Sequence, residues 1–140
     1  MTRVLGVDLG ARRIGLALSD SLGITASPLA VLERGRDHAA DHRAIVDLAH
    51  AEGAARIVVG LPRLLSARPG PAETAALTEI EELRSVAGPD LPVEAFDERF
   101  TTVIAERGLV DAGVRRQRRK QVVDKVAAAV MLGSYLESRR

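Results

Sequence analysis

The sequence predicts a mixed α/β domain, and three observations lead to that prediction. The chain has 140 residues, 46% hydrophobic and 28% charged, so it can bury a core as one soluble domain. Later apolar runs alternate with amphipathic stretches, which indicates strand–helix–strand units and a parallel part of a sheet. Three apolar runs come first with no helix between them, which adds an antiparallel part. We therefore expect residues 1–140 to form a single mixed α/β domain.

The expected strands follow five apolar runs. Turns that carry Gly10, Gly23 and Pro28 lie among the first three runs, and two connections are short enough for antiparallel neighbours. The run RIVVGLP shows no polar alternation, which favours a strand buried on both faces. The strands are expected at residues 3–9, 13–20, 27–33, 56–62 and 92–98.

Helices are expected between the later strands and after them. Asp37 can cap the first helix, and Thr101 or Thr102 can cap the third, which Gly113 would end. Apolar residues at helical spacing form the inward faces of the first two helices: Ile45, Leu48 and Ala49, then Leu77, Ile80, Leu83 and Val86. The helices are expected at residues 38–52, 72–87, 101–112 and 121–138.

Composition excludes several classes of protein and site. The chain has no cysteine, so disulfides and thiolate metal sites are excluded. No apolar run approaches the roughly 18 residues of a membrane span, and the start MTRVLGVDLG differs from a signal peptide. We therefore expect a cytoplasmic protein with no membrane partner. One tyrosine, two phenylalanines and no tryptophan leave no platform for base stacking, so nucleic acid contacts would depend on phosphates.

Three carboxylates adjoin stretches that should be buried. Asp8 lies where the first strand leaves the core, Glu98 closes the strand VEAFDE, and Asp124 precedes the apolar helical segment VAAAVML. Buried carboxylates without partners are costly and repel one another, whereas a bound dication reverses the sign of that interaction. Open α/β sheets bind ligands at the carboxyl ends of their strands. Three acids there suit a two-metal site for Mg²⁺ or Mn²⁺ that holds a phosphodiester for attack by water.

Each acid also has an ordinary interpretation. Asp8 could form a turn, Glu98 could join a surface ion pair, and Asp124 could favour a helix N-terminus. Asp20 and Asp97 are alternative metal ligands that the spacing does not exclude.

Basic side chains are concentrated at one place although the net charge is only +1. The run RRQRRK, residues 115–120, stands shortly before Asp124, so it could grip phosphates and deliver a nucleic acid backbone to the metal ions. The other interpretation is a solvated loop. Gly6 and Gly10 would allow that backbone to approach Asp8 closely. The expected nucleic-acid-binding residues are Arg12, Arg13, Arg115, Arg116, Arg118, Arg119, Lys120 and Lys125.

The chain resembles the YqgF family, also called RuvX, over almost its whole length. The resemblance rests on the ordered segments GVDLGARRIGLALSD, PLAVLER, IVVGLP, DERFTTVIAERGLVDAG and RRKQVVDKVAAAVMLGSYLE. It implies a ribonuclease H-like fold, a five-stranded mixed sheet flanked by helices. It also implies that Asp8, Glu98 and Asp124 are the catalytic, metal-binding acids of a hydrolase. The implied role is processing of the 5′ end of the precursor of 16S ribosomal RNA during ribosome biogenesis.

One segment departs from the family pattern. After GLP the family has a polar loop with Asn, Asp and Gly, whereas this chain has Arg63, Leu64, Leu65, Ser66 and Ala67. We expect the departure to affect substrate recognition more than chemistry, because the three acids are all present.

Two further motifs suggest other classes of protein. The pattern D-L-G-x-x-x-x-G resembles the first phosphate loop of actin-like ATPases and sugar kinases, but those proteins bind nucleotide between two copies of the core. A chain of 140 residues supplies one copy. The segment HAADH resembles a zinc-peptidase helix, because His38 and His42 stand at i and i+4 and His50 lies two turns on. We interpret these histidines as solvated helix residues.

The resulting expectation is a metal-dependent nuclease that uses two ions, Mg²⁺ or Mn²⁺, on precursor ribosomal RNA. Ribosomal particles are then expected partners. One alternative is a resolvase of four-way DNA junctions, which requires two active sites and hence a homodimer, whereas trimming an RNA end requires only a monomer. Another alternative is a non-catalytic ribosome-assembly factor that binds nucleic acid. The sequence does not decide between RNA and DNA.

Overall fold

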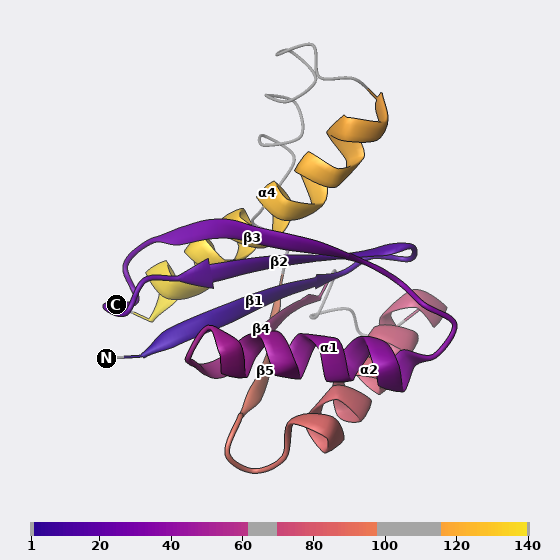
Figure 1. The fold of residues 1–140 in the computed structure, drawn as a ribbon, viewed down its shortest axis with the longest axis horizontal. Helices are drawn as coiled ribbons and strands as arrows, with labels where there is room; N and C mark the ends of the chain where they lie inside the picture. Colours follow the sequence, from indigo (N-terminus) through magenta and orange to yellow (C-terminus); the bar gives the residue numbers. More distant parts are fainter. Residues whose placement is uncertain (1, 62–69, 98–115, 140) are drawn as a thin grey trace.

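A five-stranded mixed sheet with helices on both faces forms the protein (Figure 1). The computed structural model describes residues 2–61, 70–97 and 116–139, and only the backbone of residues 72 and 116–125. The elements are β1 (Arg3–Leu9), β2 (Arg13–Ser19), β3 (Ala26–Glu33), α1 (His38–Ala51), β4 (Ala54–Leu61), α2 (Pro71–Ala87), β5 (Val93–Asp97) and α4 (Arg116–Ser138). None of the helices within these ranges is long and apolar enough to cross a membrane.

The sheet has the strand order β3-β2-β1-β4-β5, and all five predicted strands are confirmed. The first three strands pair antiparallel, as their short connections predict. Strands β4 and β5 extend the sheet from β1 in parallel pairing, with Val7 opposite Val59 and Leu61 opposite Asp97. The carboxyl ends of β1, β4 and β5 therefore meet at one edge of the sheet. The predicted helix at residues 101–112 and its caps lie outside the described residues.

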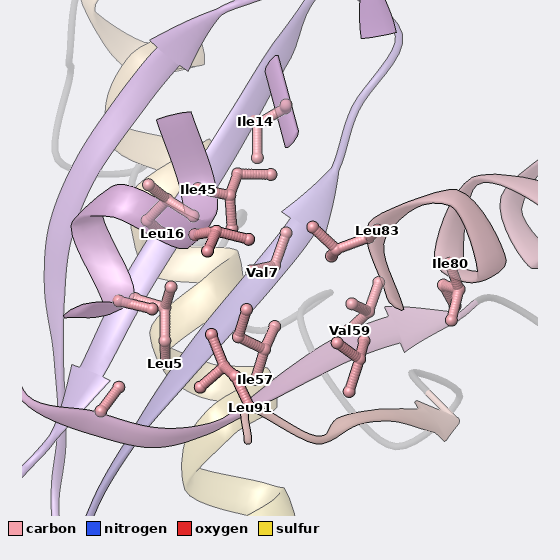
Figure 2. Packing of buried hydrophobic residues seen from close by; sticks show 14 of the residues in the cluster. Leu5, Val7, Ile14, Leu16, Ile45, Ile57, Val59, Ile80, Leu83 and Leu91 are labelled. Carbon is pink, nitrogen blue, oxygen red and sulfur yellow. The ribbon is translucent and has the colours of Figure 1, made fainter. Parts of the chain in front are cut away.

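The larger core lies between the sheet and helices α1 and α2 (Figure 2). Alternate residues of the central strands, such as Leu5 and Val7 of β1, fill it with no exposed surface. Helix α1 begins as predicted, because the Asp37 carboxylate accepts a hydrogen bond from the Ala39 amide at 2.9 Å. Its residues Ile45 and Ala49 are fully buried, so the predicted inward face is confirmed.

The inward face of α2 differs from the prediction at one residue. Ile80 and Leu83 are buried as expected, but Leu77 is 40% exposed. Ala76 packs against the larger core instead. Successive residues of a helix are rotated by about 100°, so Leu77 lies at the margin of the buried face.

Helix α4 covers the opposite face of the sheet and forms a smaller core there. It begins at Arg116, five residues before the predicted start, so residues 116–120 of the basic run belong to the helix and are not a loop. Arginine, glutamine and lysine are good helix formers, and no proline interrupts residues 116–138, so the helix extends through the run. The helix lies close to β1 because Gly6 has no side chain. A Cβ at Gly6 would be 2.9 Å from Leu132 Cβ.

The contact between Gly6 and Leu132 leads to a stability prediction. Gly6→Ala should lower the free energy of unfolding by about 1–3 kcal/mol, because α4 must move away from β1 to admit the methyl group. Gly133→Ala is the matched control on the helix side: a Cβ there meets nothing within 4 Å and should stabilise α4 by up to about 1 kcal/mol. Urea denaturation of both variants measures the difference. Equal stability of the two variants would contradict this account of the packing.

Candidate active site

Asp8 lies at the carboxyl end of β1, where the sequence predicts a ligand site. It pairs with Gly15 of β2 and is half-buried. Its neighbour Val7 points into the larger core, so strand alternation directs Asp8 to the face of the sheet that α4 covers. A half-buried carboxylate at this edge has the hard oxygen donors that Mg²⁺ and Mn²⁺ prefer.

The turn that follows Asp8 explains Gly10 without any ligand. The Gly10 amide donates to the carbonyl oxygens of Asp8 at 3.1 Å and Arg13 at 3.0 Å. A Cβ at Gly10 would lie 2.5 Å from the Arg13 carbonyl oxygen, so no other residue fits this turn without a backbone shift. Gly6 is likewise explained by its contact with Leu132. Both glycines therefore serve contacts inside the protein, and their role in admitting a nucleic acid backbone stays a prediction.

Helix α4 runs against the direction of β1, which places its earlier residues toward the edge where Asp8 lies. Tyr135, near its carboxyl end, accepts a hydrogen bond from Arg56 at 3.0 Å and donates one to Glu94 at 2.9 Å, beside the starts of β4 and β5. Leu132 crosses β1 at Gly6. Figure 1 shows the same course, because the end of α4 and the start of β1 lie at the same end of the sheet. Asp124 precedes Leu132 by eight residues, about 12 Å along the helix axis.

The fold decides whether Asp20, one of the two alternative metal ligands, can act together with Asp8. Asp20 closes the turn between β2 and β3, where its Oδ1 accepts hydrogen bonds from the amides of Ile24 at 2.7 Å and Thr25 at 3.1 Å. Bonds from Thr25 and Ile24 hold the pKa of Asp20 below its ordinary value. Because β2 is antiparallel to β1, Asp20 lies at the edge opposite Asp8 and is not a metal ligand with it.

Asp97 ends β5 and is the other alternative ligand. Phe96 packs in the smaller core with α4, so strand alternation directs Asp97 to the opposite face of the sheet from Asp8. Glu98, the predicted ligand, lies outside the described residues, as does the side chain of Asp124.

The predicted basic residues fall into two groups. Arg12 is exposed and Arg13 half-buried in the β1–β2 turn, close in sequence to Asp8. The others come before or within the first turns of α4. Arg115 lies outside the described residues, and only the backbone is described for Arg116, Arg118, Arg119, Lys120 and Lys125. The chain thus brings Arg12 and Arg13 to the edge of Asp8, while the positions of the remaining basic side chains stay predictions.

A buried ion-pair network supports the turn beside Asp8 from the face of the sheet opposite α4. Arg34, just after β3, donates from Nε to the Gly10 carbonyl at 2.6 Å, and its guanidinium binds both oxygens of Glu79 at 2.7 and 2.9 Å. Glu79 also contacts His42 Nε2 at 2.8 Å. We define these three side chains, Arg34, Glu79 and His42, as the Arg34 network. It joins α1 and α2 to the β1–β2 turn.

The Arg34 network corrects one interpretation and adds residues that sequence reasoning did not identify. His42 is only 1% exposed, so it is not a solvated helix residue, whereas His38 and His50 are exposed as expected. Burial alone would raise the pKa of Glu79, but hydrogen bonds from Arg34 and His42 outweigh it and hold that pKa below its ordinary value. The spacing of HAADH pointed to the two histidines, but nothing local in the sequence indicated Glu79 or Arg34 as partners.

The family follows from comparison with known proteins. A family model described as RuvX, Holliday junction resolvase, matches residues 2–138. The chain belongs to the RuvX family. A relative from Desulforudis audaxviator, named as a pre-16S rRNA nuclease, is 44% identical over 138 residues, which cover 99% of this chain and 96% of that protein. A relative from Symbiobacterium thermophilum with the same name is also 44% identical, over 98% of this chain and 93% of that protein.

Solved structures place the RuvX chain in the ribonuclease H-like fold. RuvC of Thermus thermophilus, solved in complex with a Holliday junction substrate, has a TM-score of 0.56 and 18% identity, and covers 99% of this chain and 96% of its own. A second structure of Thermus thermophilus RuvC has a TM-score of 0.52 and 16% identity, over 98% and 95% of the two chains. At these identities the likeness shows the fold alone, and it confirms the fold that the RuvX resemblance implied.

One group of side chains in the described part of this RuvX protein could hold a metal ion. It consists of His38, His42 and Glu79, whose ligand atoms all lie within 4.8 Å of one another. This group is separate from Asp8, since it lies between α1 and α2 while Asp8 is on the face of the sheet that α4 covers. The atypical residues Arg63–Ala67 lie outside the described ranges.

Proposed function

We propose that this RuvX-family protein is a metal-dependent nuclease that hydrolyses phosphodiester bonds in precursor 16S ribosomal RNA. The observation that carries the proposal is the match to relatives named for this activity at 44% identity over nearly the whole of both chains. The position of Asp8 at the ligand edge of a ribonuclease H-like sheet supports the same chemistry. Processing of ribosomal RNA places the protein in the cytoplasm, with ribosomal particles as partners.

Asp8, Glu98 and Asp124 are the proposed catalytic residues, and their carboxylates would hold two Mg²⁺ or Mn²⁺ ions. Such ions lower the pKa of the attacking water and stabilise the leaving oxygen. Asp8 would supply its charge from the end of β1, and a hydrogen bond from Arg34 Nε to the Gly10 carbonyl holds the turn that follows it. The alternation in β5 directs Asp97 away from this face, which favours Glu98 as the second acid.

Resolution of four-way DNA junctions is the second candidate function. The family description, Holliday junction resolvase, favours it. This function requires paired cuts, and therefore two copies of the chain acting together, whereas RNA trimming requires one. The number of copies that act on one substrate thus distinguishes the two functions.

Cleavage of three labelled substrates tests the proposal directly. The substrates are precursor 16S ribosomal RNA, an unrelated single-stranded RNA of equal length and a four-way DNA junction, each with Mg²⁺ or Mn²⁺. Metal-dependent cutting at the 5′ end of the ribosomal precursor is the expected result. Symmetric paired cuts in the junction alone would establish the resolvase function instead. Binding without cutting of any substrate would favour a non-catalytic assembly factor.

The basic start of α4 leads to a prediction about substrate affinity. We expect Arg116→Gln and Arg119→Gln to flatten the slope of log affinity against log salt by about 0.7 per lost phosphate contact on single strands and about 0.9 on duplex. Arg43→Gln, at an exposed position of α1, is the control and should leave the slope unchanged. Fluorescence anisotropy at several salt concentrations measures the slope. An unaltered slope in both α4 variants would remove these arginines from the binding surface.

A further inference from the structure

The group between α1 and α2 has the composition of a metal site. His38 and His42 are one helical turn apart on α1, so they share a face. Glu79 approaches that face from α2, and the three ligand atoms lie within 4.8 Å of one another. Two imidazoles and one carboxylate are a ligand set that binds Zn²⁺ and leaves a fourth position open.

The ligands at the buried end of the group are already fixed in place. Glu79 Oε2 lies 2.8 Å from His42 Nε2, and both side chains are almost fully buried. Arg34 binds both Glu79 oxygens and so sets the direction of the carboxylate. Hydrogen bonds to a ligating carboxylate from such an outer partner are typical of metal centres. An ion bound to both His42 Nε2 and Glu79 Oε2 would keep the two residues as neighbours.

Charge and access also favour a cation here. Asp41, which is 8% exposed, adds a second carboxylate that acts electrostatically on Arg34. Asp41 Oδ1 accepts a hydrogen bond from the Gly35 amide, but its buried Oδ2 has no hydrogen-bond partner within the part of the chain that the structure describes. Glu79 and Asp41 thus outnumber the single guanidinium of Arg34. His38 is exposed, so an ion can reach the group from solvent.

We propose that His38, His42 and Glu79 bind one Zn²⁺ ion, with a solvent molecule in the remaining position. The site is distinct from Asp8, which lies on the opposite face of the sheet, and it is independent of the proposed nuclease function. Because Glu79 is joined through Arg34 to the Gly10 carbonyl, a bound ion ties α1 and α2 to the turn beside Asp8. The ion therefore stabilises the half of the molecule that contains the larger core.

Metal binding by the full chain tests the proposal. After treatment with chelator, the protein is titrated with Zn²⁺ by calorimetry and with Co²⁺ by visible absorption, in excess Mg²⁺ to occupy the acidic site. We expect one ion per chain, a Co²⁺ spectrum of low coordination number and a rise in the melting temperature with Zn²⁺. His38→Ala should weaken binding at least about tenfold, since even loss of an outer partner has that effect. His38 is exposed, so this variant is expected to fold.

Two controls separate this site from other sources of binding. His50→Ala removes an exposed histidine of the same helix and should leave the affinity unchanged. Asp8→Asn removes a proposed catalytic acid and should also leave it unchanged, whatever becomes of nuclease activity. Absence of stoichiometric binding, or equal affinity of wild type and His38→Ala, would overturn the proposal and leave the Arg34 network as a metal-free ion pair. If His50→Ala weakens Zn²⁺ binding as much as His38→Ala does, the proposal is also overturned, because the metal then binds to surface histidines in general.

Discussion

Asp8→Asn is expected to reduce Mg²⁺-dependent cleavage at least about a hundredfold while the fold remains intact. Asparagine keeps the size of the side chain and one oxygen but removes the negative charge that holds a dication. Loss of an outer-shell partner alone lowers metal affinity or activity by about 10–100-fold, so loss of a ligand should have at least that effect. The side chain is half-buried at a strand end and outside both cores, so the melting temperature should change little.

Asp20→Asn is the matched control for Asp8→Asn. Asp20 is also an aspartate at a strand end, but it lies at the opposite edge of the sheet, where its Oδ1 accepts bonds from two backbone amides. Asparagine can accept the same bonds, so folding and cleavage should both persist. Single-turnover cleavage with saturating enzyme, at several Mg²⁺ concentrations, compares the variants. Wild-type cleavage by Asp8→Asn would remove this residue from the catalytic site.

Much of the fold could be predicted from local sequence patterns. The five strands are short apolar runs bounded by turn residues, and Asp37 caps α1 as the sequence indicates. The predictions failed where local patterns compete. Leu77 fits the apolar spacing of α2 but lies at its margin, and the basic residues before Gln121 are charged yet are good helix formers.

The candidate site was predictable only in part. The strand-end position of Asp8 is local information, and the structure confirms it. The Arg34 network was not predictable, because Glu79 is 45 residues from Arg34 and 37 from His42, and no periodic pattern marks these residues as partners. The sequence also suggested that Gly6 and Gly10 admit a nucleic acid backbone, whereas the structure shows that both make close contacts within the protein. Their contacts with Leu132 and Arg13 depend on tertiary packing and on turn geometry.

Arg34→Met is expected to cause the largest loss of stability, about 3–5 kcal/mol. The side chains of Arg34 and Glu79 are only 12% and 9% exposed, so removing the guanidinium leaves a buried carboxylate without its main partner. Arg56→Met is the matched control. Arg56 pairs with Glu94 on the other face, but those side chains are 32% and 35% exposed, so water and salt screen the pair. Its loss should lower stability by only about 1 kcal/mol.

A pH series can show that the orphaned charge causes this loss. In the metal-free wild type the pKa of Glu79 is lowered, so the stabilisation by ionised Glu79 is present above its unfolded value, near 4.5, and disappears as the pH falls through the lowered folded value. In Arg34→Met, burial acts with less opposition and raises that pKa, so the variant loses stability as the pH rises. The difference between the two proteins should therefore widen from acid to neutral pH.

The double variant Arg34→Met/Glu79→Gln separates charge from packing. It removes both charges but keeps a neutral side chain that can accept a hydrogen bond from His42. Replacing a buried ion pair by neutral groups is often close to neutral in stability, so the double variant should recover much of the loss at pH 7 and show no widening with pH. If the double variant is as unstable as Arg34→Met at every pH, lost packing and the lost bond to the Gly10 carbonyl, and not the carboxylate, account for the effect.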